Sequence, residues 1–483
     1  MTDHSGRRML KGFSMLSGAS SAATVMSILT NKAIAVIAGT DGIALMGLFR
    51  SLGSLVKSGL ALGYSTLFMQ QISVARSSEE ARLTISAAGQ LLVLQLLIVI
   101  ALAGTCSGLL EQWILGPEGG EGRRLIIRVV LLMAFGNLIL DTIQAMLKGS
   151  GSIPALTWVQ IATAGSSLAL ILPLLKLGDL GLAVNVGSGS VVGAAVGGIW
   201  LWRLYRPGFR DLFAKAGTDL LARATGPSLV LCGLAIVLMG TQLGMRSIIG
   251  RSWGLAALGH FTAALLIVET MVTLLMSSIR TQLVSALGAT AERAEKDALT
   301  ARMLNLGMVA VALSGAIIIL AGGPLLRLLF SDRFEAASAL MAVLCLSTFS
   351  QAVSWCCHSL FLHRSDVRSL LVLDASWCPI MLCGTAIAAR LDWDLASLAW
   401  VYVASYAFQA ALYLAAALRS FGRGFFGPRE AATAAFAAGV LFAGFGTTQL
   451  ATPATFPVWA LATAACIIAL LHLSGLKGWF LES

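Results

Sequence analysis

Charged residues are scarce in this sequence. Lys, Arg, Asp and Glu together make up 12% of the 483 residues, whereas soluble globular proteins carry about 25%. Hydrophobic residues make up 57%, and the mean hydropathy is +0.86. The apolar excess extends along nearly the whole chain. The composition therefore excludes a soluble domain with a single anchor and indicates a polytopic membrane protein.

Catalytic and metal-binding patterns are missing as well. We find no phosphate-binding glycine loop, no nucleophile motif and no histidine or cysteine spacing typical of a metal site. The eight cysteines all lie in apolar segments, and we interpret them as free thiols that pack as small hydrophobic side chains. The chain is predicted to be no enzyme and to need no cofactor. Its energy is expected to come from a gradient, the membrane potential or the concentration difference of its own substrate.

Long apolar runs are what the sequence does contain. They lack strict alternation and are long enough for helices, which can cross lipid because they satisfy their own backbone hydrogen bonds. The sequence predicts an all-α fold with fourteen spans. Their approximate limits are 14–39, 43–69, 85–110, 125–147, 153–175, 180–202, 225–249, 254–279, 303–328, 335–361, 369–388, 395–418, 430–449 and 457–475.

The net charge of +10 is spread over basic residues that lie singly between the apolar runs. This distribution is typical of membrane topology and argues against a nucleic-acid partner. With the N-terminus inside, inner segments hold 21 Lys and Arg and outer segments hold 9. The positive-inside rule therefore predicts that both termini are cytoplasmic.

An internal repeat indicates two related halves. GIALMGLF at 42–49 matches GLAALGHF at 254–261, an offset of 212 residues, and LKGS at 147–150 weakly matches LHRS at 362–365, an offset of 215. We predict two six-helix lobes, 1–205 and 225–420, a cytoplasmic connector at 206–224 and a C-terminal helix pair in 421–483. Such repeats are typical of transporters, whose substrate site lies between the repeats.

Glycines are abundant, with 50 in the chain. Several fall in small-residue stretches, such as 187–190 followed by Gly193, Gly197 and Gly198. Small residues let membrane helices approach closely, so this stretch is predicted to lie at a helix contact.

Three cations fall within the first two predicted spans, namely Lys32, Arg50 and Lys57, without an acid in those spans. Charges facing lipid are costly, so we expect a wet cavity that binds an anion, chiefly phosphate, which arginine recognises with a bidentate fork. The alternatives are an ion pair between the lobes or snorkelling to the interface, most plausible for Lys32. Arg128 and Arg246 are interpreted as snorkelling anchors near span ends.

Three acids within spans are candidates for ion coupling: Glu269, Asp141 and Asp374. Each also has a structural alternative. Asp141 could pair with a neighbouring cation, Glu269 could be protonated or hydrogen-bonded, and Asp374 could lie at the interface. His260 is expected to be packed or to line a wall.

The segment 32–50 resembles the end of helix one and the start of helix two in Wzx-type polysaccharide flippases of the multidrug/oligosaccharidyl-lipid/polysaccharide (MOP) exporter superfamily. The segment AMLKGSG at 145–151 resembles the family's segment after helix four. The resemblance implies two six-helix lobes around a cationic cavity, followed by two further helices. It also implies that Lys32 and Arg50, the matched positions, bind a diphosphate or an acidic sugar.

The implied activity is translocation of an undecaprenyl-diphosphate-linked oligosaccharide across the bacterial inner membrane by alternating access, coupled to a gradient of H⁺ or Na⁺. The cargo would be a repeat unit of O-antigen, enterobacterial common antigen or exopolysaccharide, as in lipopolysaccharide and polysaccharide biosynthesis. The implied partners are this lipid-linked glycan, membrane lipid, a polysaccharide polymerase and a chain-length regulator.

The same sequence features argue for or against other classes of membrane protein. A MATE-type multidrug/cation antiporter would have twelve spans and an acidic cavity, so fourteen spans and the basic set argue against it. A lipid II flippase shares both features and stays open. A major-facilitator transporter should carry a Gly-xxx-Asp-Arg/Lys loop between spans two and three, which 73–84 lacks. A polysaccharide polymerase or ligase needs a sizeable external loop, and the longest candidate is only 111–124.

Overall fold

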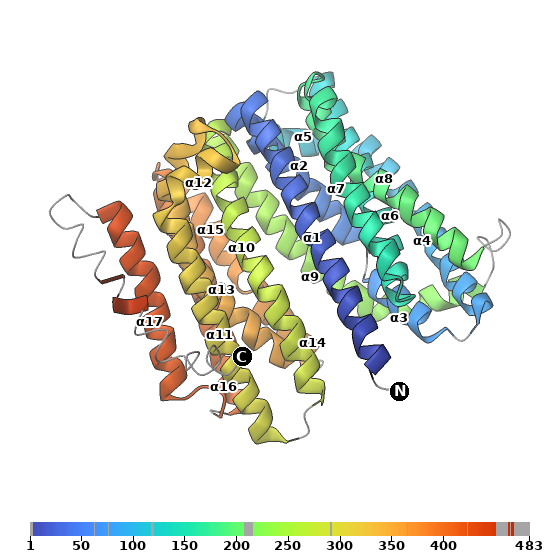
Figure 1. The fold of residues 1–483 in the computed structure, drawn as a ribbon. Coiled ribbons are helices and arrows are strands. Elements are labelled where there is room, and N and C mark those ends of the chain that lie inside the picture. Colours follow the sequence, from blue (N-terminus) through green and yellow to red (C-terminus); the bar gives the residue numbers. More distant parts are fainter. Residues whose placement is uncertain are drawn as a thin grey trace. The chain divides into compact units, whose positions relative to one another are not determined.

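The computed structural model describes residues 3–61, 63–75, 77–116, 120–206, 216–289, 292–364, 366–422, 424–450, 462–463 and 465–467. These residues form α-helices, short 3₁₀ and π turns and their connections, with no β-strand among them. The predicted all-α fold class is thereby confirmed (Figure 1).

Two compact units divide the chain, Met1–Arg251 and Ser252–Ser483. The first unit holds nine helices in the described residues. They are α1 (Asp3–Ile37), α2 (Gly39–Ala61), α3 (Tyr64–Val74), α4 (Ser78–Thr105), α5 (Ser107–Leu115), α6 (Glu121–Gly149), α7 (Ile153–Leu175), α8 (Asp179–Tyr205) and α9 (Ala216–Ser252).

The second unit begins at the end of α9. Its described helices are α10 (Gly254–Ala289), α11 (Arg293–Leu320), α12 (Gly322–Leu329), η2 (Asp332–Ala337), α13 (Ser338–His363), α14 (Val367–Ala375), α15 (Trp377–Arg390), α16 (Leu395–Phe421), α17 (Pro428–Phe445) and η3 (Gly446–Leu450).

Thirteen helices in the described part of the chain are long and apolar enough to cross a membrane. They correspond to the first thirteen predicted spans and indicate a multi-pass membrane protein. The fourteenth predicted span, 457–475, falls almost wholly outside the described residues, whereas the thirteenth, 430–449, lies within them. Residues 207–215 of the predicted connector also lie outside them. The proposed lobe limits, 1–205 and 225–420, stay predictions.

The helix bounds repeat along the chain at an offset of 215 residues. The first residues of α4 and α11 are 215 positions apart, and so are their last residues. The same offset separates Gly39 and Gly254, which begin α2 and α10 with positive φ of 67° and 87°. The offset of 212 read from 42–49 is therefore wrong by three residues. Three residues are nearly one helical turn, so small and apolar positions coincide again when the register slips by that amount.

Several predicted spans are broken helices, and three of the breaks lie at or just before a glycine or proline. The span 43–69 is interrupted at Gly63, which has a φ of 70°. In 303–328, α11 ends at Leu320, four residues before Pro324, and in 369–388, α14 ends at Ala375, four residues before Pro379. Proline has no N–H to donate to the carbonyl four residues earlier, so the helix ends there.

Short side chains fix several helix starts. The Ser77 hydroxyl accepts from the backbone N–H of Glu80 at 3.2 Å, at the start of α4. The Asp394 carboxylate accepts from the backbone N–H of Ser397 at 3.0 Å, at the start of α16. The hydroxyl and then the backbone N–H of Ser397 lower the pKa of Asp394. These bonds satisfy amide groups that have no partner inside the helix.

In the first unit, α8 packs closely against α6 and α7. A Cβ added at Gly187 or Gly197 would overlap atoms of α6, and one added at Gly189 or Gly193 would overlap atoms of α7. The predicted small-residue contact is thus confirmed at these four positions, whereas a Cβ at Gly198 would meet nothing within 4 Å.

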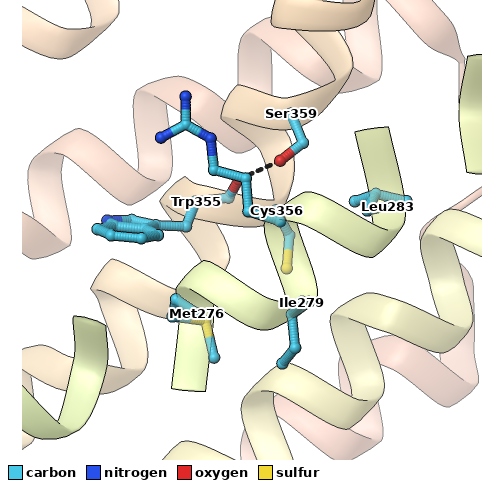
Figure 2. Close-up of a pocket in the computed structure, with 7 residues that line it drawn as sticks. Met276, Ile279, Leu283, Trp355, Cys356 and Ser359 are labelled. Atoms are coloured by element: carbon cyan, nitrogen blue, oxygen red, sulfur yellow. Dashed lines mark hydrogen bonds between the residues drawn. The ribbon is translucent and has the colours of Figure 1, made fainter. Parts of the chain in front are cut away.

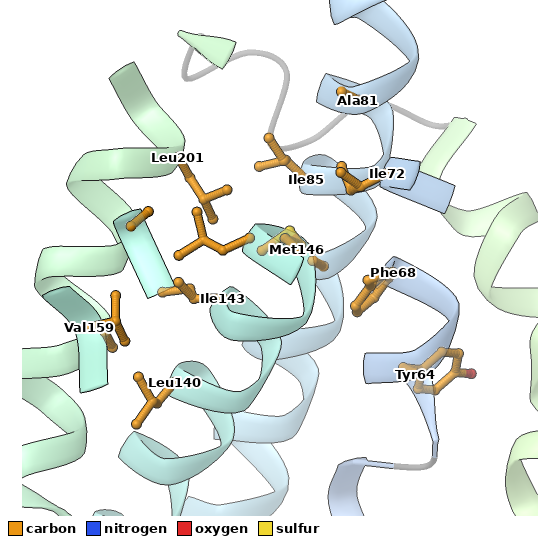
Figure 3. Packing of buried hydrophobic residues seen from close by; sticks show 14 of the residues in the cluster. Tyr64, Phe68, Ile72, Ala81, Ile85, Leu140, Ile143, Met146, Val159 and Leu201 are labelled. Carbon is orange, nitrogen blue, oxygen red and sulfur yellow. The ribbon is translucent and has the colours of Figure 1, made fainter. Parts of the chain in front are cut away.

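An apolar cluster joins α3, α4, α6, α7 and α8 (Figure 3). Phe68, Leu147 and Val159 are fully buried in it. Helices in lipid associate through close packing of this kind, because lipid tails are as apolar as the side chains themselves. The cluster therefore holds α6, which carries Asp141, against its neighbouring helices.

Candidate functional site

Arg246 is the most buried arginine among the described residues, with 7% of its surface exposed. It lies on α9, and its Nη1 donates to the carbonyl oxygen of Gly47 at 3.4 Å and to the hydroxyl of Ser51, both on α2. Ser51 in turn donates to the Gly47 carbonyl at 2.9 Å. The interpretation of Arg246 as a snorkelling anchor is wrong, because α2 holds the guanidinium inside the first unit.

The Nε of Arg246 is buried and has no hydrogen-bond partner among the described residues. A buried donor without an acceptor is costly, and for a charged group the cost is larger. The geometry thus leaves one N–H of a charged group available for an acceptor that the described residues do not supply.

Arg50 lies on α2 next to Ser51 and is half-buried. Arg50 and Arg246 are close enough to repel each other electrostatically. Within the described residues, no Asp or Glu forms an ion pair with either arginine. Two neighbouring guanidinium groups without a counter-charge form a site that is complementary to an anion.

Lys57, the third predicted cation, has a partner. Its Nζ lies 2.9 Å from Oδ2 of Asp141 on α6, and the two side chains are 32% and 38% exposed. The structural alternative stated for Asp141, pairing with a neighbouring cation, is what the structure shows. Lys57 and Asp141 neutralise each other, so the excess positive charge here comes from Arg50 and Arg246. Lys32 is half-buried near the end of α1, and its predicted role stays a prediction.

Glu269 lies in the second unit on α10, half-buried and within electrostatic reach of Tyr406 on α16. The ring of Tyr406 stacks on Trp377, with centroids 5.2 Å apart, and lies 4.8 Å from that of Tyr402. Glu269 is therefore next to a group of aromatic rings, which attract cations through their faces. Its role in ion coupling stays a prediction.

Asp374 takes part in a polar network. Its Oδ1 accepts a hydrogen bond of 2.5 Å from the hydroxyl of Tyr413 and lies 3.3 Å from Nδ1 of His358. Sequence patterns did not single out His358 or Tyr413, which lie on α13 and α16. The polar character of both was visible in the sequence, but their approach to α14 depends on tertiary packing.

His260 is packed against neighbouring residues, which is one of the two environments expected for it. Its Nε2 lies 3.1 Å from the backbone oxygen of Arg333, and its ring meets Phe334 edge to face at 5.9 Å. Arg128 is exposed, with its Nε 3.3 Å from the Ser107 hydroxyl. Among the described residues, no three His, Cys, Asp or Glu side chains lie close enough together to hold a metal ion.

Comparisons with known proteins find similarity at the level of structure. No protein-family model matches the sequence, and a search of curated proteins gives no match. A MATE family multidrug resistance transporter of the MOP superfamily, solved in an inward-facing conformation, aligns with a TM-score of 0.68 and 15% identity over 83% of this chain and 95% of that chain.

Two further structures align over 86% of this chain and 96% of theirs. The MATE multidrug transporter DinF-BH in complex with R6G gives a TM-score of 0.62 at 15% identity. A MOP superfamily transporter from Pyrococcus furiosus, for which a reversed polarity of the binding pocket suggests a different function, gives 0.61 at 17% identity. The chain therefore has the all-helical fold of the MOP superfamily transporters, MATE transporters among them.

Proposed function

We propose that this chain is a membrane transporter for an anionic lipid-linked substrate, and specifically a flippase for an undecaprenyl-diphosphate-linked oligosaccharide. The observation that carries the proposal is the pair Arg50 and Arg246, which has no acidic partner among the described residues. The shared fold supports a transporter, and the sequence resemblance to polysaccharide flippases supports the lipid-linked cargo.

A diphosphate fits the chemistry of this site. Its oxygens are acceptors only, so they can satisfy the buried Nε of Arg246 and neutralise both guanidinium groups. A planar guanidinium binds two oxygens of one phosphate at once, and a diphosphate has enough oxygens to serve both guanidinium groups. The hydrocarbon part of the substrate needs no specific recognition, because a polyprenyl chain can stay in the bilayer.

Complementation tests the proposal. The chain is expressed in a bacterium lacking its flippase for O-antigen or enterobacterial common antigen, and surface glycan is assayed against accumulated lipid-linked repeat units. The native chain is expected to restore surface glycan, and Arg50→Gln with Arg246→Gln to abolish the rescue. Arg327→Gln is the matched control, because Arg327 is exposed and pairs with Glu335 at 2.5 Å. Full rescue by the double variant would contradict the role of the arginines.

A lipid II flippase would use the same diphosphate chemistry. Rescue of lipid II flipping by the native chain, without rescue of glycan export, would therefore move the cargo to lipid II and leave the arginine site unchanged.

A cation antiporter is the second candidate, favoured by one observation. Glu269 lies beside Tyr406, which stacks on Trp377, and an acid among aromatic rings is suited to organic cations. Drug susceptibility measured with the native chain and Glu269→Gln distinguishes the candidates. Resistance that depends on Glu269 and not on Arg50 would favour the antiporter.

A further inference from the structure

A second polar cluster lies in the second unit and joins four helices. His358 on α13 contacts Arg280 on α10, Asp374 on α14 and Tyr413 on α16. The side chains of His358 and Asp374 are 18% and 22% exposed, and Tyr413 is 1% exposed. A titratable group so placed can alter the contacts of several helices when it gains or loses a proton.

The contacts determine which nitrogen of His358 carries the proton. Nη2 of Arg280 lies 3.2 Å from Nε2 of His358. A guanidinium only donates hydrogen bonds, so Nε2 must be the unprotonated acceptor. The proton of the neutral ring is then on Nδ1, which faces Oδ1 of Asp374 at 3.3 Å and the Tyr413 hydroxyl at 3.1 Å. Because the Tyr413 hydroxyl donates to Asp374, it can still accept from Nδ1.

In this arrangement the charges balance. Arg280 carries one positive charge, Asp374 carries one negative charge, and the neutral ring lies between them. Within the described residues, no charged side chain of α11, α12, η2 or α17 contacts His358. Cys357, the neighbour of His358 on α13, lies within electrostatic reach of Tyr413. The next histidine, His363, contacts Lys296 of α11 at 3.5 Å instead.

A proton on Nε2 cannot coexist with this contact. Nε2 has one lone pair, and a proton there would point at the N–H groups of Arg280 and place two cations together. The guanidinium must then leave. Arg280 is half-buried rather than enclosed, so its guanidinium can turn away from the ring. It borders a small pocket that Trp355 and Ser359 also line (Figure 2).

We propose that the coupling ion is a proton, bound at Nε2 of His358 in exchange for the guanidinium of Arg280. Proton uptake forms the Nε2–H bond, breaks the hydrogen bond between α10 and α13 and leaves the hydrogen bonds of Asp374 in place. Proton release restores the original contact. A sodium ion fits less well, since it needs several oxygen ligands and Oδ1 of Asp374 already faces two partners.

The proposal names the coupling ion for the transport proposed above, and proton binding can be tested without transport. Histidine-selective ¹⁵N labelling of the full chain in nanodiscs reports which nitrogen is protonated, and the signal of His358 is assigned by its loss in His358→Gln. We expect the Nδ1–H tautomer at high pH and protonation of Nε2 on acidification. An Nε2–H tautomer at high pH, or no titration between pH 5 and pH 9, would overturn the proposal.

The competition between proton and guanidinium has its own test. In Arg280→Met the titration midpoint of His358 should move to higher pH by at least one unit, a tenfold gain in proton affinity. Arg280→Lys, which keeps the positive charge, should shift it less and serves if Arg280→Met does not fold. His363 is the internal control and should titrate unchanged. An unchanged midpoint of His358 in both variants would overturn the exchange.

An export assay links the two proposals, and its outcomes distinguish a failure of one from a failure of the other. If the native chain rescues glycan export, His358→Gln should remove the dependence of that export on a proton gradient while binding of inorganic pyrophosphate persists. If the native chain fails to rescue, the proposed cargo is wrong, and the nitrogen titration still decides whether His358 exchanges a proton for Arg280.

Discussion

At the scale of single residues, the anion site depends on how α2 holds Arg246. The guanidinium contacts Gly47 and Ser51 one helical turn apart, which fixes the orientation of its remaining N–H groups. Lysine has the same charge but lacks the planar fork. Charge alone therefore does not reproduce this site.

We predict that Arg246→Lys weakens binding of inorganic pyrophosphate by about tenfold, corresponding to about 1.4 kcal/mol, which is within the range for a charge-assisted hydrogen bond. Isothermal titration of the purified chain in detergent measures this. Arg327→Lys, which changes an exposed arginine paired with Glu335, should bind as the native chain does. Equal affinity of Arg246→Lys and the native chain would show that the fork has no role.

The pair formed by Lys57 and Asp141 allows a second prediction at this scale. Each partner is about one third exposed, so water screens the pair and its coupling energy should be about 1 kcal/mol. Lys57→Met should lower the thermal unfolding temperature more than Lys57→Met combined with Asp141→Leu, because the single change leaves a carboxylate without its partner. A double variant that unfolds at or below the temperature of Lys57→Met alone would refute this account.

At the scale of helices, two glycines of α8 that differ in their surroundings can be compared. A Cβ at Gly187 would overlap the backbone of Met133 on α6, whereas one at Gly198 would meet nothing within 4 Å. Gly187→Ala should destabilise the fold by about 1–3 kcal/mol, since α6 and α8 must separate. Gly198→Ala should be neutral or slightly stabilising, because alanine has the higher helix propensity. Thermal unfolding of both variants measures the contrast, and equal effects would contradict the close contact.

The start of α16 gives a prediction about pH. Ser397 lowers the pKa of Asp394, so this carboxylate stabilises the folded chain above its unfolded pKa and ceases to do so as the pH falls through its folded pKa. At pH 7, Asp394→Ala should cost about 1 kcal/mol, as for other N-caps. The difference from the native chain should shrink as the pH falls through the lowered pKa of Asp394. A difference that is constant with pH would show that Asp394 does not act as an ionised cap.

The positions of the helices were predictable because hydropathy is a local property of the chain. The breaks within these helices were only partly predictable. Pro324 and Pro379 explain where α11 and α14 end, whereas the interruption after α2 depends on the left-handed φ of Gly63. The repeat was found from a short match, but its correct offset needed complete helices, because a shift of one turn preserves the apolar pattern.

At the scale of the whole molecule, contacts between residues far apart in the chain could not be predicted from the sequence. Arg50 and Lys57 were both candidates because of their charge. Their sequence neighbours did not indicate that Lys57 has an acidic partner and Arg50 has none among the described residues. The partner of Lys57 is on α6, and the residue that joins Arg50 is on α9, in hydrogen-bond contact with Ser51 195 residues earlier. The cluster around His358 likewise assembles residues from four helices.

The most direct measurement of the central claim is translocation itself. The purified chain is placed in liposomes that contain an undecaprenyl-diphosphate-linked oligosaccharide, and the fraction of glycan accessible to an added glycosidase is followed over time. The account predicts fast transfer between leaflets by the native chain and by Arg327→Gln, and loss of transfer with Arg50→Gln and Arg246→Gln. Transfer that persists in the double variant, or none with the native chain, would contradict it.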